Sequence, residues 1–468
     1  MKNNSNQSGF YLLSDNTDAF VARFALATLA EKTLDIQYYL MHNDASGEYL
    51  GYAILAAADR GVHVRILVDD INLSGRDSRL KMLSQHSNIE IRIFNPLANR
   101  QWFRNIELII NLNRAGRRMH NKTFIADSSS AIIGGRNIGD EYFDARHSLN
   151  FVDLDLLSIG PIVNEITVSF DAYWNSQWAT AIEDLSKIKV VRKQLSGIRR
   201  KLKDKWRHAK NSEYFHSLQL SDFTKKLINK QIPFIWANAE LLYDRPEKMT
   251  KDKAEKHTHF AAQLFSYVEQ ASKELLITSP YFVPGNKGVK IFKNKLKQGM
   301  SISILTNSLA ATDVIAAHAG YKKYRKQLAE SGITLFELKT TAQHFLSKTK
   351  QFIKGSSNAS LHAKYMVIDE QYVFIGSANL DPRSQLLNTE IGIIVNSKEL
   401  ARLTRQLFMQ ATSASNSYQL AINNKNKQLC WKTEEHGKQI QYANEPKASL
   451  LKKLGVYILG LLPIESLL

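Results

Sequence analysis

Short apolar runs alternate with amphipathic helical patterns along most of the chain, which predicts an α/β fold. Residues 33–39 have the pattern of a buried strand, and the helical pattern of residues 19–31 precedes them. Residues 275–282 form a second such strand, after a helical pattern at residues 259–272. The same order of elements therefore occurs twice in the sequence.

Two further pairs of segments extend this repeat. Residues 60–70 and 298–307 each place a glycine between a helical pattern and a strand pattern. A third strand at residues 89–94 has its counterpart at residues 333–338. An internal duplication of this length predicts two halves of similar structure within the chain of 468 residues.

The distribution of basic and apolar residues predicts further segment boundaries along the chain. Residues 187–210 contain eleven Lys or Arg and one acidic residue, which predicts either a lipid-facing segment around Trp206 or a solvated linker helix. No apolar run is long enough to span a bilayer, and the N-terminus has no secretion signal pattern. We expect five parts: a polar tail (1–16), a first domain (17–185), a basic linker (186–232), a second domain (233–448) and an apolar C-terminal segment (449–468).

Charge and cysteine content narrow the function classes. The formal net charge of +18 favours anionic partners, namely nucleic acid, anionic lipid or phosphorylated substrates, although a solvated basic surface explains it equally well. Cys430 is the only cysteine, so an intramolecular disulfide and a C-x-x-C metal site are excluded.

A histidine-lysine-aspartate motif occurs once in each half with identical spacing. In both copies six residues separate the aspartate from a segment that begins with glycine and ends in asparagine. The two histidines are 242 positions apart, the offset that also relates the strands. The first copy contains His120, Lys122, Asp127 and Asn137, and the second contains His362, Lys364, Asp369 and Asn379.

The apolar residues after each lysine predict a buried strand, in which side chains alternate between two faces. Each histidine therefore shares a face with the lysine two positions on. Asp127 and Asp369 follow at an odd separation, so we expect them to have structural roles, although they complete the motif and are grouped with its catalytic residues.

The remaining motif residues suit a phosphoryl oxyanion. Two lysines and the amides of Asn137 and Asn379 predict a phosphate clamp, and the glycines would let backbone approach the ligand. One histidine would attack phosphorus and the other would protonate the leaving alcohol. A nucleophilic histidine needs an acceptor for its second nitrogen, for which Asp153 or Asp155 and Glu390 are candidates. We expect no metal and no cofactor, because the cationic side chains can neutralise the phosphate.

These motifs resemble those of the phospholipase D superfamily. The segments GGRNIGDEYF (134–143), NLDPRS (379–384) and LNTE (387–390) are similar to bacterial cardiolipin synthases. The segments LTNSLA (305–310), HAGY (318–321) and LPIE (462–465) look most like the C-type enzymes.

The resemblance implies two α-β-α sandwich domains related by a pseudo-twofold axis, with one active site at their interface. It also implies that His120 attacks, that His362 is the acid and base, and that Asp153 and Glu390 hold the histidines, while Asp155 stays open. The implied reaction is transfer of a phosphatidyl group from one phospholipid to another. For the C type, phosphatidylglycerol and phosphatidylethanolamine would give cardiolipin.

Two other functions are compatible with parts of the sequence. A phospholipase D that hydrolyses lipids to phosphatidic acid, such as a secreted bacterial effector, shares the first half-reaction. A nuclease or nucleic-acid binder fits the charge but not the synthase-like motifs, so we expect phospholipid substrates and an anionic membrane as partners, and no nucleic acid. The oligomeric state is not predicted. We expect peripheral attachment to the cytoplasmic side of a bacterial membrane, or to host membranes after secretion, through residues 96–112, 187–210 or 450–462.

Overall fold

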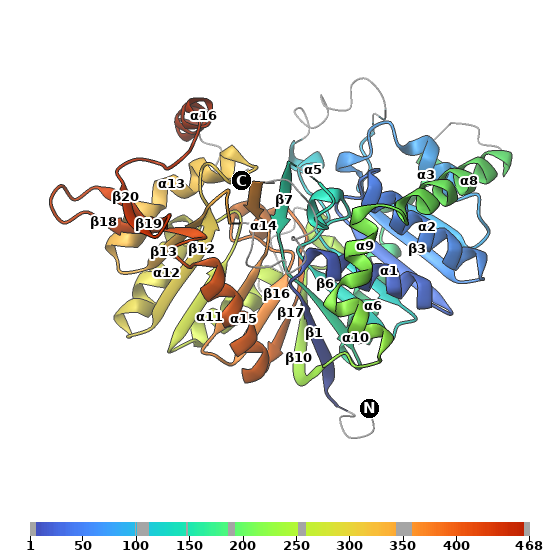
Figure 1. Ribbon diagram of the computed structural model, residues 1–468, viewed down its shortest axis with the longest axis horizontal. Helices are drawn as coiled ribbons and strands as arrows, with labels where there is room; N and C mark the ends of the chain where they lie inside the picture. The colour runs from blue at the N-terminus through green and yellow to red at the C-terminus, as the bar shows by residue number, and fades with distance from the viewer. Residues whose placement is uncertain are drawn as a thin grey trace.

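Two α/β halves lie side by side in the computed structural model (Figure 1). The structure describes residues 6–98, 100, 112–146, 148–185, 192–250, 259–342 and 358–462. Most of the candidate membrane segment at residues 96–112, including Trp102, Phe103 and Arg104, lies outside this part of the chain.

The first half is a mixed sheet covered by helices on both faces. Its parallel strands are β2 (Thr33–Tyr38), β3 (His63–Asp69) and β4 (Ile89–Phe94), and its antiparallel strands include β5 (Thr123–Ala126), β6 (Ser130–Gly134) and β8 (Asp155–Ile159). The main helices are α1 (Asn16–Leu29), α2 (Ala45–Asp59), α3 (Asp77–Leu83) and α6 (Ile162–Trp174).

The second half repeats this arrangement in the same strand order, which confirms the α/β duplication read from the sequence. Its strands are β11 (Glu274–Thr278), β12 (Ser301–Asn307), β13 (Thr334–Leu338), β15 (Tyr365–Ile368), β16 (Tyr372–Gly376) and β17 (Ile391–Asn396). Its helices are α11 (Phe260–Gln270), α12 (Gly285–Lys297), α13 (Ile315–Glu330) and α15 (Lys398–Ala411). An antiparallel extension, β18 (Ser417–Ile422), β19 (Leu429–Glu435) and β20 (Lys438–Tyr442), continues from β13 at the outer edge.

The two sheets are continuous through β1 (Ser8–Leu13) and β10 (Ile235–Tyr243). Strand β1 lies between β8 and β10, and β10 pairs in turn with β17. The expectation of a polar tail over residues 1–16 is therefore wrong for β1. Its apolar run is short, but Phe10 and Leu13 are completely buried and the strand lies at the centre of the molecule.

A second contact between the halves lies close to the predicted motifs. Strand β7 (Leu149–Val152) of the first half pairs in parallel with β14 (Asn358–Leu361) of the second. A hydrophobic core spans this seam, with Met119 and Ile125 from one half and Leu276, Leu361 and Ile391 from the other. Because the core is shared, we expect the halves to hold each other in a fixed orientation.

The basic linker forms three helices that pack on the first half: α8 (Arg192–Ala209), α9 (Glu213–Leu220) and α10 (Asp222–Ile228). Leu195, Leu202 and Ala209 make one buried face of α8. Trp206 stacks on Phe24, with ring centroids 4.7 Å apart. The lipid-facing interpretation of Trp206 is therefore wrong, because its ring packs against the body of the protein, while most basic side chains of α8 stay exposed.

The C-terminal helix α16 (Leu450–Gly460) rests on α13 and stands at the top of the molecule in Figure 1. Val456 is buried against Leu309 and Ala319, whereas a stripe of apolar side chains on its other face stays exposed. Within the part of the chain that the structure describes, no helix is both long and apolar enough to cross a bilayer.

Candidate active site

His120 and His362 occupy equivalent places at the seam. Each lies in an extended segment just before a strand, β5 or β15, so the pair precedes the predicted strands rather than lying within them. The His120 amide donates to the Thr389 carbonyl at 2.9 Å, and the His362 amide donates to the Val152 carbonyl at 2.8 Å. Each histidine backbone is thus hydrogen-bonded to the opposite half of the chain.

The carboxylates that hold the histidines are exchanged between the halves. Nδ1 of His120 lies 2.9 Å from Oε2 of Glu390, a second-half residue just before β17. Nδ1 of His362 lies 2.6 Å from Oδ2 of Asp153, a first-half residue between β7 and β8. The sequence named both carboxylates but not this crossed pairing. Neither histidine has its carboxylate partner without the other half.

Burial sets the protonation states of these pairs. Both histidines are at most 7% exposed. Burial lowers the pKa of His120 to about 4, against the opposing effect of Glu390, and it also lowers the pKa of His362. Burial alone would raise the pKa of each carboxylate. The interaction with His120 instead lowers the pKa of Glu390, and the interaction with His362 lowers that of Asp153 to about 2. At neutral pH each ionised carboxylate therefore accepts Nδ1–H from a neutral imidazole, and Nε2 keeps its lone pair.

The two motif lysines lie beside the histidines. Nζ of Lys122 donates to the His120 carbonyl at 2.6 Å, and Nζ of Lys364 donates to the His362 carbonyl. Nδ1 of His362 also lies 3.0 Å from Nζ of Lys364, but Nδ1 carries the proton given to Asp153 and cannot accept from the lysine as well. Burial lowers the pKa of both lysines, and the charge of Lys364 lowers the pKa of Lys122 further. An anion bound between them would restore their charge.

Asp127 and Asp369 lie away from the histidines. Each follows the end of its strand in a left-handed conformation, with φ of 53°. Asp127 accepts backbone N–H bonds from residues 31–33, at the start of β2. Asp369 makes the same contacts with residues 272–274 at the start of β11. The structure therefore gives both aspartates a structural role, which the odd spacing predicted, and not the catalytic role with which they were grouped.

We expect Asp127→Ala to destabilise the protein by about 1–3 kcal/mol, because it leaves three backbone donors without their acceptor. The kcat of the folded variant should stay close to that of the wild type. Urea unfolding and activity measured on the same sample separate the two effects. A large fall in kcat with unchanged stability would contradict the structural role.

The two motif asparagines differ in their surroundings. Nδ2 of Asn137 donates to the Tyr142 hydroxyl at 2.9 Å, and its Oδ1 accepts from the Leu40 amide. Oδ1 of Asn379 is buried and has no hydrogen-bond partner among the described residues. Phosphate binding by these two amides is a proposal, and Nδ2 of Asn137 already donates to Tyr142.

The glycines of the first motif make room for a carboxylate. A Cβ on Gly135 would lie 2.2 Å from Oδ1 of Asp153, so a side chain there would displace the partner of His362. We expected the glycines to let a ligand approach the backbone, but at Gly135 the space is taken by the side chain of Asp153. In the second motif the matching residue is Ser377, whose hydroxyl donates to Glu390. Sequence reasoning missed this role, and its only signal was the change from GG to GS.

Asp155 belongs to a separate buried cluster. Its Oδ2 lies 2.8 Å from Arg23 and 3.1 Å from Arg136, and all three side chains are almost completely buried. The choice between Asp153 and Asp155 that the sequence left open is therefore decided by contact: Asp153 reaches His362, and Asp155 pairs with arginines.

Aromatic rings line both histidines, which the sequence did not indicate. The Tyr39 ring lies 5.0 Å from the His120 ring. The rings of Tyr142 and Phe151 lie 5.2 Å and 5.0 Å from that of His362. Because these rings pack edge-on or tilted against the imidazoles, we expect them to fix the imidazole orientation and limit access of water.

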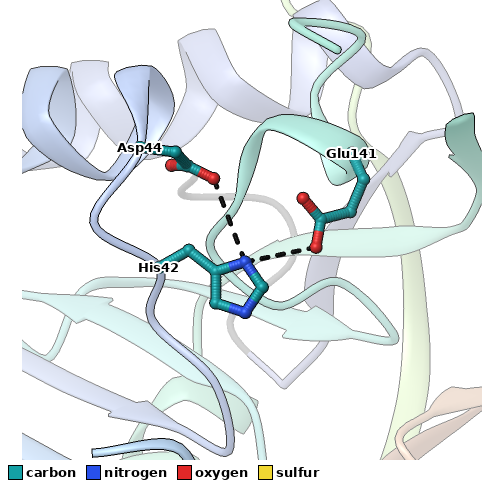
Figure 2. A group of neighbouring side chains, drawn as sticks. All are labelled: His42, Asp44 and Glu141. Carbon is teal, nitrogen blue, oxygen red and sulfur yellow. Dashed lines mark ion pairs between the residues drawn. The ribbon is translucent and has the colours of Figure 1, made fainter. Parts of the chain in front are cut away.

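His42, Asp44 and Glu141 are the one group of potential metal-ligating side chains that the structure brings together within its described ranges (Figure 2). Nδ1 of His42 lies 3.2 Å from Glu141 and 3.9 Å from Asp44. The hydrogen bond with Glu141 raises the pKa of His42. Asp44 also caps α2 and accepts from the Asp140 amide at 2.8 Å. These contacts account for the group as an ion-pair network that fixes the start of α2.

Comparison with known proteins identifies the family to which this geometry belongs. The family model described as "Cardiolipin synthase, PLD-like domain" matches residues 25–174 and 264–412, one stretch in each half. The chain belongs to the phospholipase D-like cardiolipin synthase family. The family modifies phospholipids, so the resemblance of the motifs is confirmed.

Individual relatives support this assignment. Cardiolipin synthase C of Escherichia coli (strain K12) is 40% identical over 463 residues, which cover 99% of this chain and 96% of that protein. Cardiolipin synthase A of Pseudomonas entomophila is 22% identical and covers 85% of this chain and 67% of its own length. The crystal structure of phosphatidylserine synthase from Haemophilus influenzae superposes with a TM-score of 0.62 at 14% identity, covering 100% of this chain and 98% of that one. That likeness confirms the two-domain fold.

Proposed function

We propose that this protein is a cardiolipin synthase that transfers a phosphatidyl group through a phosphohistidine on His120. One observation supports it above the others: two buried histidines, each hydrogen-bonded to a carboxylate of the opposite half, stand beside two lysines. Such a site offers a nucleophile, a proton carrier and cationic groups for a phosphodiester.

In the first half-reaction Nε2 of His120 attacks phosphorus of the donor lipid. The bond between phosphorus and the headgroup oxygen breaks, and a protonated His362 gives its proton to the departing alcohol. Attack places positive charge on the His120 imidazole, which ionised Glu390 at 2.9 Å stabilises. Lys122 and Lys364 would balance the negative charge on the phosphoryl oxygens, and the amide of Asn379 would donate a hydrogen bond to them.

In the second half-reaction His362 works in reverse. The neutral imidazole accepts the proton of an incoming lipid alcohol, whose oxygen displaces His120 from phosphorus. Asp153 keeps His362 in the required tautomer and stabilises the imidazolium that forms. If the acceptor is phosphatidylglycerol the product is cardiolipin, and if it is water the product is phosphatidic acid.

Incubation with phosphatidylglycerol vesicles, with and without phosphatidylethanolamine, distinguishes these outcomes. The proposal requires cardiolipin as the main product, and none with the His120→Gln variant. Phosphatidic acid alone would make the protein a hydrolase and would contradict the transferase proposal while leaving the first half-reaction intact.

The pKa shifts predict an acidic optimum for the free enzyme. His120 must be unprotonated to attack, so activity is lost as pH falls through its pKa of about 4. His362 must be protonated to act as the acid, so activity is lost as pH rises through a pKa lowered from 6.5. We expect the kcat/KM of a short-chain soluble phosphatidylglycerol to peak below pH 6.5. An alkaline limb above pH 6.5 would contradict the protonation state given to His362, and an acid limb at or above pH 6.5 would contradict that given to His120.

We also propose that the protein docks on its membrane through α16. Leu450, Leu451 and Leu454 are 83%, 81% and 55% exposed, and Tyr457 and Ile458 continue the same stripe. The net charge of +18 favours an anionic surface beneath it. We place the protein on the cytoplasmic face of a bacterial membrane, with secretion to host membranes as the alternative.

Replacing both Leu451 and Leu454 by glutamate should weaken binding to anionic vesicles by about tenfold or more, because two exposed apolar contacts become charges of the wrong sign. Vesicle sedimentation measures the loss. The change leaves Val456 and its packing on α13 in place. Turnover of a soluble short-chain lipid should be unaffected, and unchanged vesicle binding would contradict docking through this helix.

A further inference from the structure

The residue before His362 is held by an amide side chain at the end of β12. Oδ1 of Asn307 accepts the Leu361 N–H at 2.8 Å, and Nδ2 of Asn307 donates to the Leu361 carbonyl at 2.9 Å. Asn307 is 1% exposed and lies in the segment LTNSLA (305–310), one of those that resemble the C-type synthases. Both polar atoms of a buried side chain therefore bind one residue beside a motif histidine.

Leu361 needs such a partner because it lies in a sheet of two strands. In the pair formed by β14 and β7, the amides of His362 and Ala363 donate to the Val152 carbonyl. The N–H and carbonyl of Leu361 bind the side chain of Asn307, which takes the place of a third strand and satisfies two buried backbone groups. The peptide that joins Leu361 to His362 is thus held at its carbonyl by Asn307 and at its N–H by Val152.

The first half repeats this arrangement with a carboxylate in place of the amide. Asp69 is the last residue of β3, the strand that corresponds to β12, and it is completely buried. Its Oδ2 accepts the N–H of Met119, the residue before His120, at 2.9 Å, and its Oδ1 lies 3.2 Å from Nη1 of Arg118. The same contact therefore occurs in both halves although the residue type differs, which favours a role in placing the histidines.

We propose that Asn307 and Asp69 are positioning residues, each of which sets the direction in which the neighbouring motif histidine points. The inference rests on the proposed function, in which the two histidines have different tasks. Asn307 acts through His362, the acid and base, whereas Asp69 acts through His120, the nucleophile. Displacement of a reacting group by about 1 Å can lower a rate by about 100-fold. Loss of Asn307 should therefore slow proton transfer, and loss of Asp69 should slow attack at phosphorus.

Two leaving groups of different basicity separate these effects. Glycerol leaves phosphatidylglycerol with a proton from His362, whereas p-nitrophenolate leaves its phosphatidyl ester without one. The full-length protein is mixed with a short-chain form of each substrate, and rapid-quench measurements follow the first release of each headgroup. Asn307→Ala should slow glycerol release by about 100-fold and nitrophenolate release by about threefold or less. His362→Gln is the reference for complete loss of the acid.

Two further variants complete the comparison. Asp69→Asn should slow both releases to a similar extent, because attack by His120 is common to both substrates. Asn88→Ala is the matched control and should slow neither: Nδ2 of Asn88 also donates to a backbone carbonyl, that of Ala58, at 3.0 Å, but it lies before β4, at the end of the sheet away from Asp69. The two releases are compared as a ratio on one preparation, so the fraction of folded protein cancels. If Asn307→Ala gives no folded protein, Asn307→Asp takes its place, since it has the same shape and keeps the acceptor for the Leu361 N–H.

The outcomes separate the positioning role from the reaction itself. Equal slowing of both releases in Asn307→Ala, or slowing of neither, would overturn the role of Asn307, because a merely structural residue affects both substrates alike. Slowing of glycerol release alone in Asp69→Asn, or slowing of neither release, would overturn the role of Asp69. A wild-type protein that releases neither headgroup, or equal slowing of both in His362→Gln, would instead contradict the proposed function.

Discussion

His120→Gln should lower phosphatidyl transfer by about 10,000-fold or more, because no other group can form the phosphohistidine. Glutamine keeps the volume and a polar amide beside Glu390, so the variant should fold. His362→Gln should cause a loss of similar size, since both half-reactions move a proton through that residue. Because the two histidines act in one sequence of steps, the double variant should be hardly slower than either single variant.

His63→Gln is the matched control for these losses. His63 also pairs with a glutamate, at 2.8 Å from Glu90, but this pair is exposed on the first half. The control should keep full activity, and circular dichroism should show the native fold for all variants. Activity within tenfold of the wild type in either active-site variant would contradict the two-histidine mechanism.

Glu390→Gln should lower kcat by about 100- to 10,000-fold while vesicle binding is kept. The carboxylate is completely buried and accepts from Nδ1 of His120 and from the Ser377 hydroxyl. Its charge stabilises the cationic imidazole that forms when His120 attacks phosphorus. A neutral amide can keep the hydrogen bond but cannot supply that charge, so the slowest step should be formation of the phosphohistidine.

The crossed pairing makes this result specific. Glu390 is in the second half of the chain, yet its loss should slow the step carried out by the first-half histidine. Pre-steady-state release of the headgroup measures that step directly. Glu90→Gln, in the exposed pair with His63, is the control and should have no effect. If Glu390→Gln slowed only transfer to the acceptor, the assignment of His120 as nucleophile would be wrong.

Much of the fold was predictable because the apolar patterns of helices and strands occur in the same order in both halves of the sequence. Strand β11 is buried on both faces and has a short apolar run, whereas β2 has its apolar residues at alternate positions, separated by Asp35 and Gln37. Strand β1 was missed because its short run follows a polar N-terminus, and its burial depends on pairing with β8 and β10, which are distant in sequence. Tertiary pairing of this kind leaves no local signal.

The sequence predicted which residues form the site but not which carboxylate pairs with which histidine. The histidines and lysines follow from a spacing that places them on one face. The spacing cannot tell which carboxylate reaches which histidine, because that depends on how the halves meet at β7 and β14. It also cannot separate Asp153 from Asp155, two residues apart in one acidic-apolar segment. That separation depends on Arg23 and Arg136, which neutralise Asp155 from other elements.

The most direct test of the central claim is to trap the phosphohistidine. A phosphatidyl ester of p-nitrophenol has a leaving group that needs no proton, so His362→Gln should still form the intermediate and then stall, because no base activates the acceptor. We predict a burst of one nitrophenolate per enzyme and a phosphatidyl group on the peptide that contains His120. Absence of the adduct in this variant, with an equivalent adduct on His362 in the His120→Gln variant, would contradict the account.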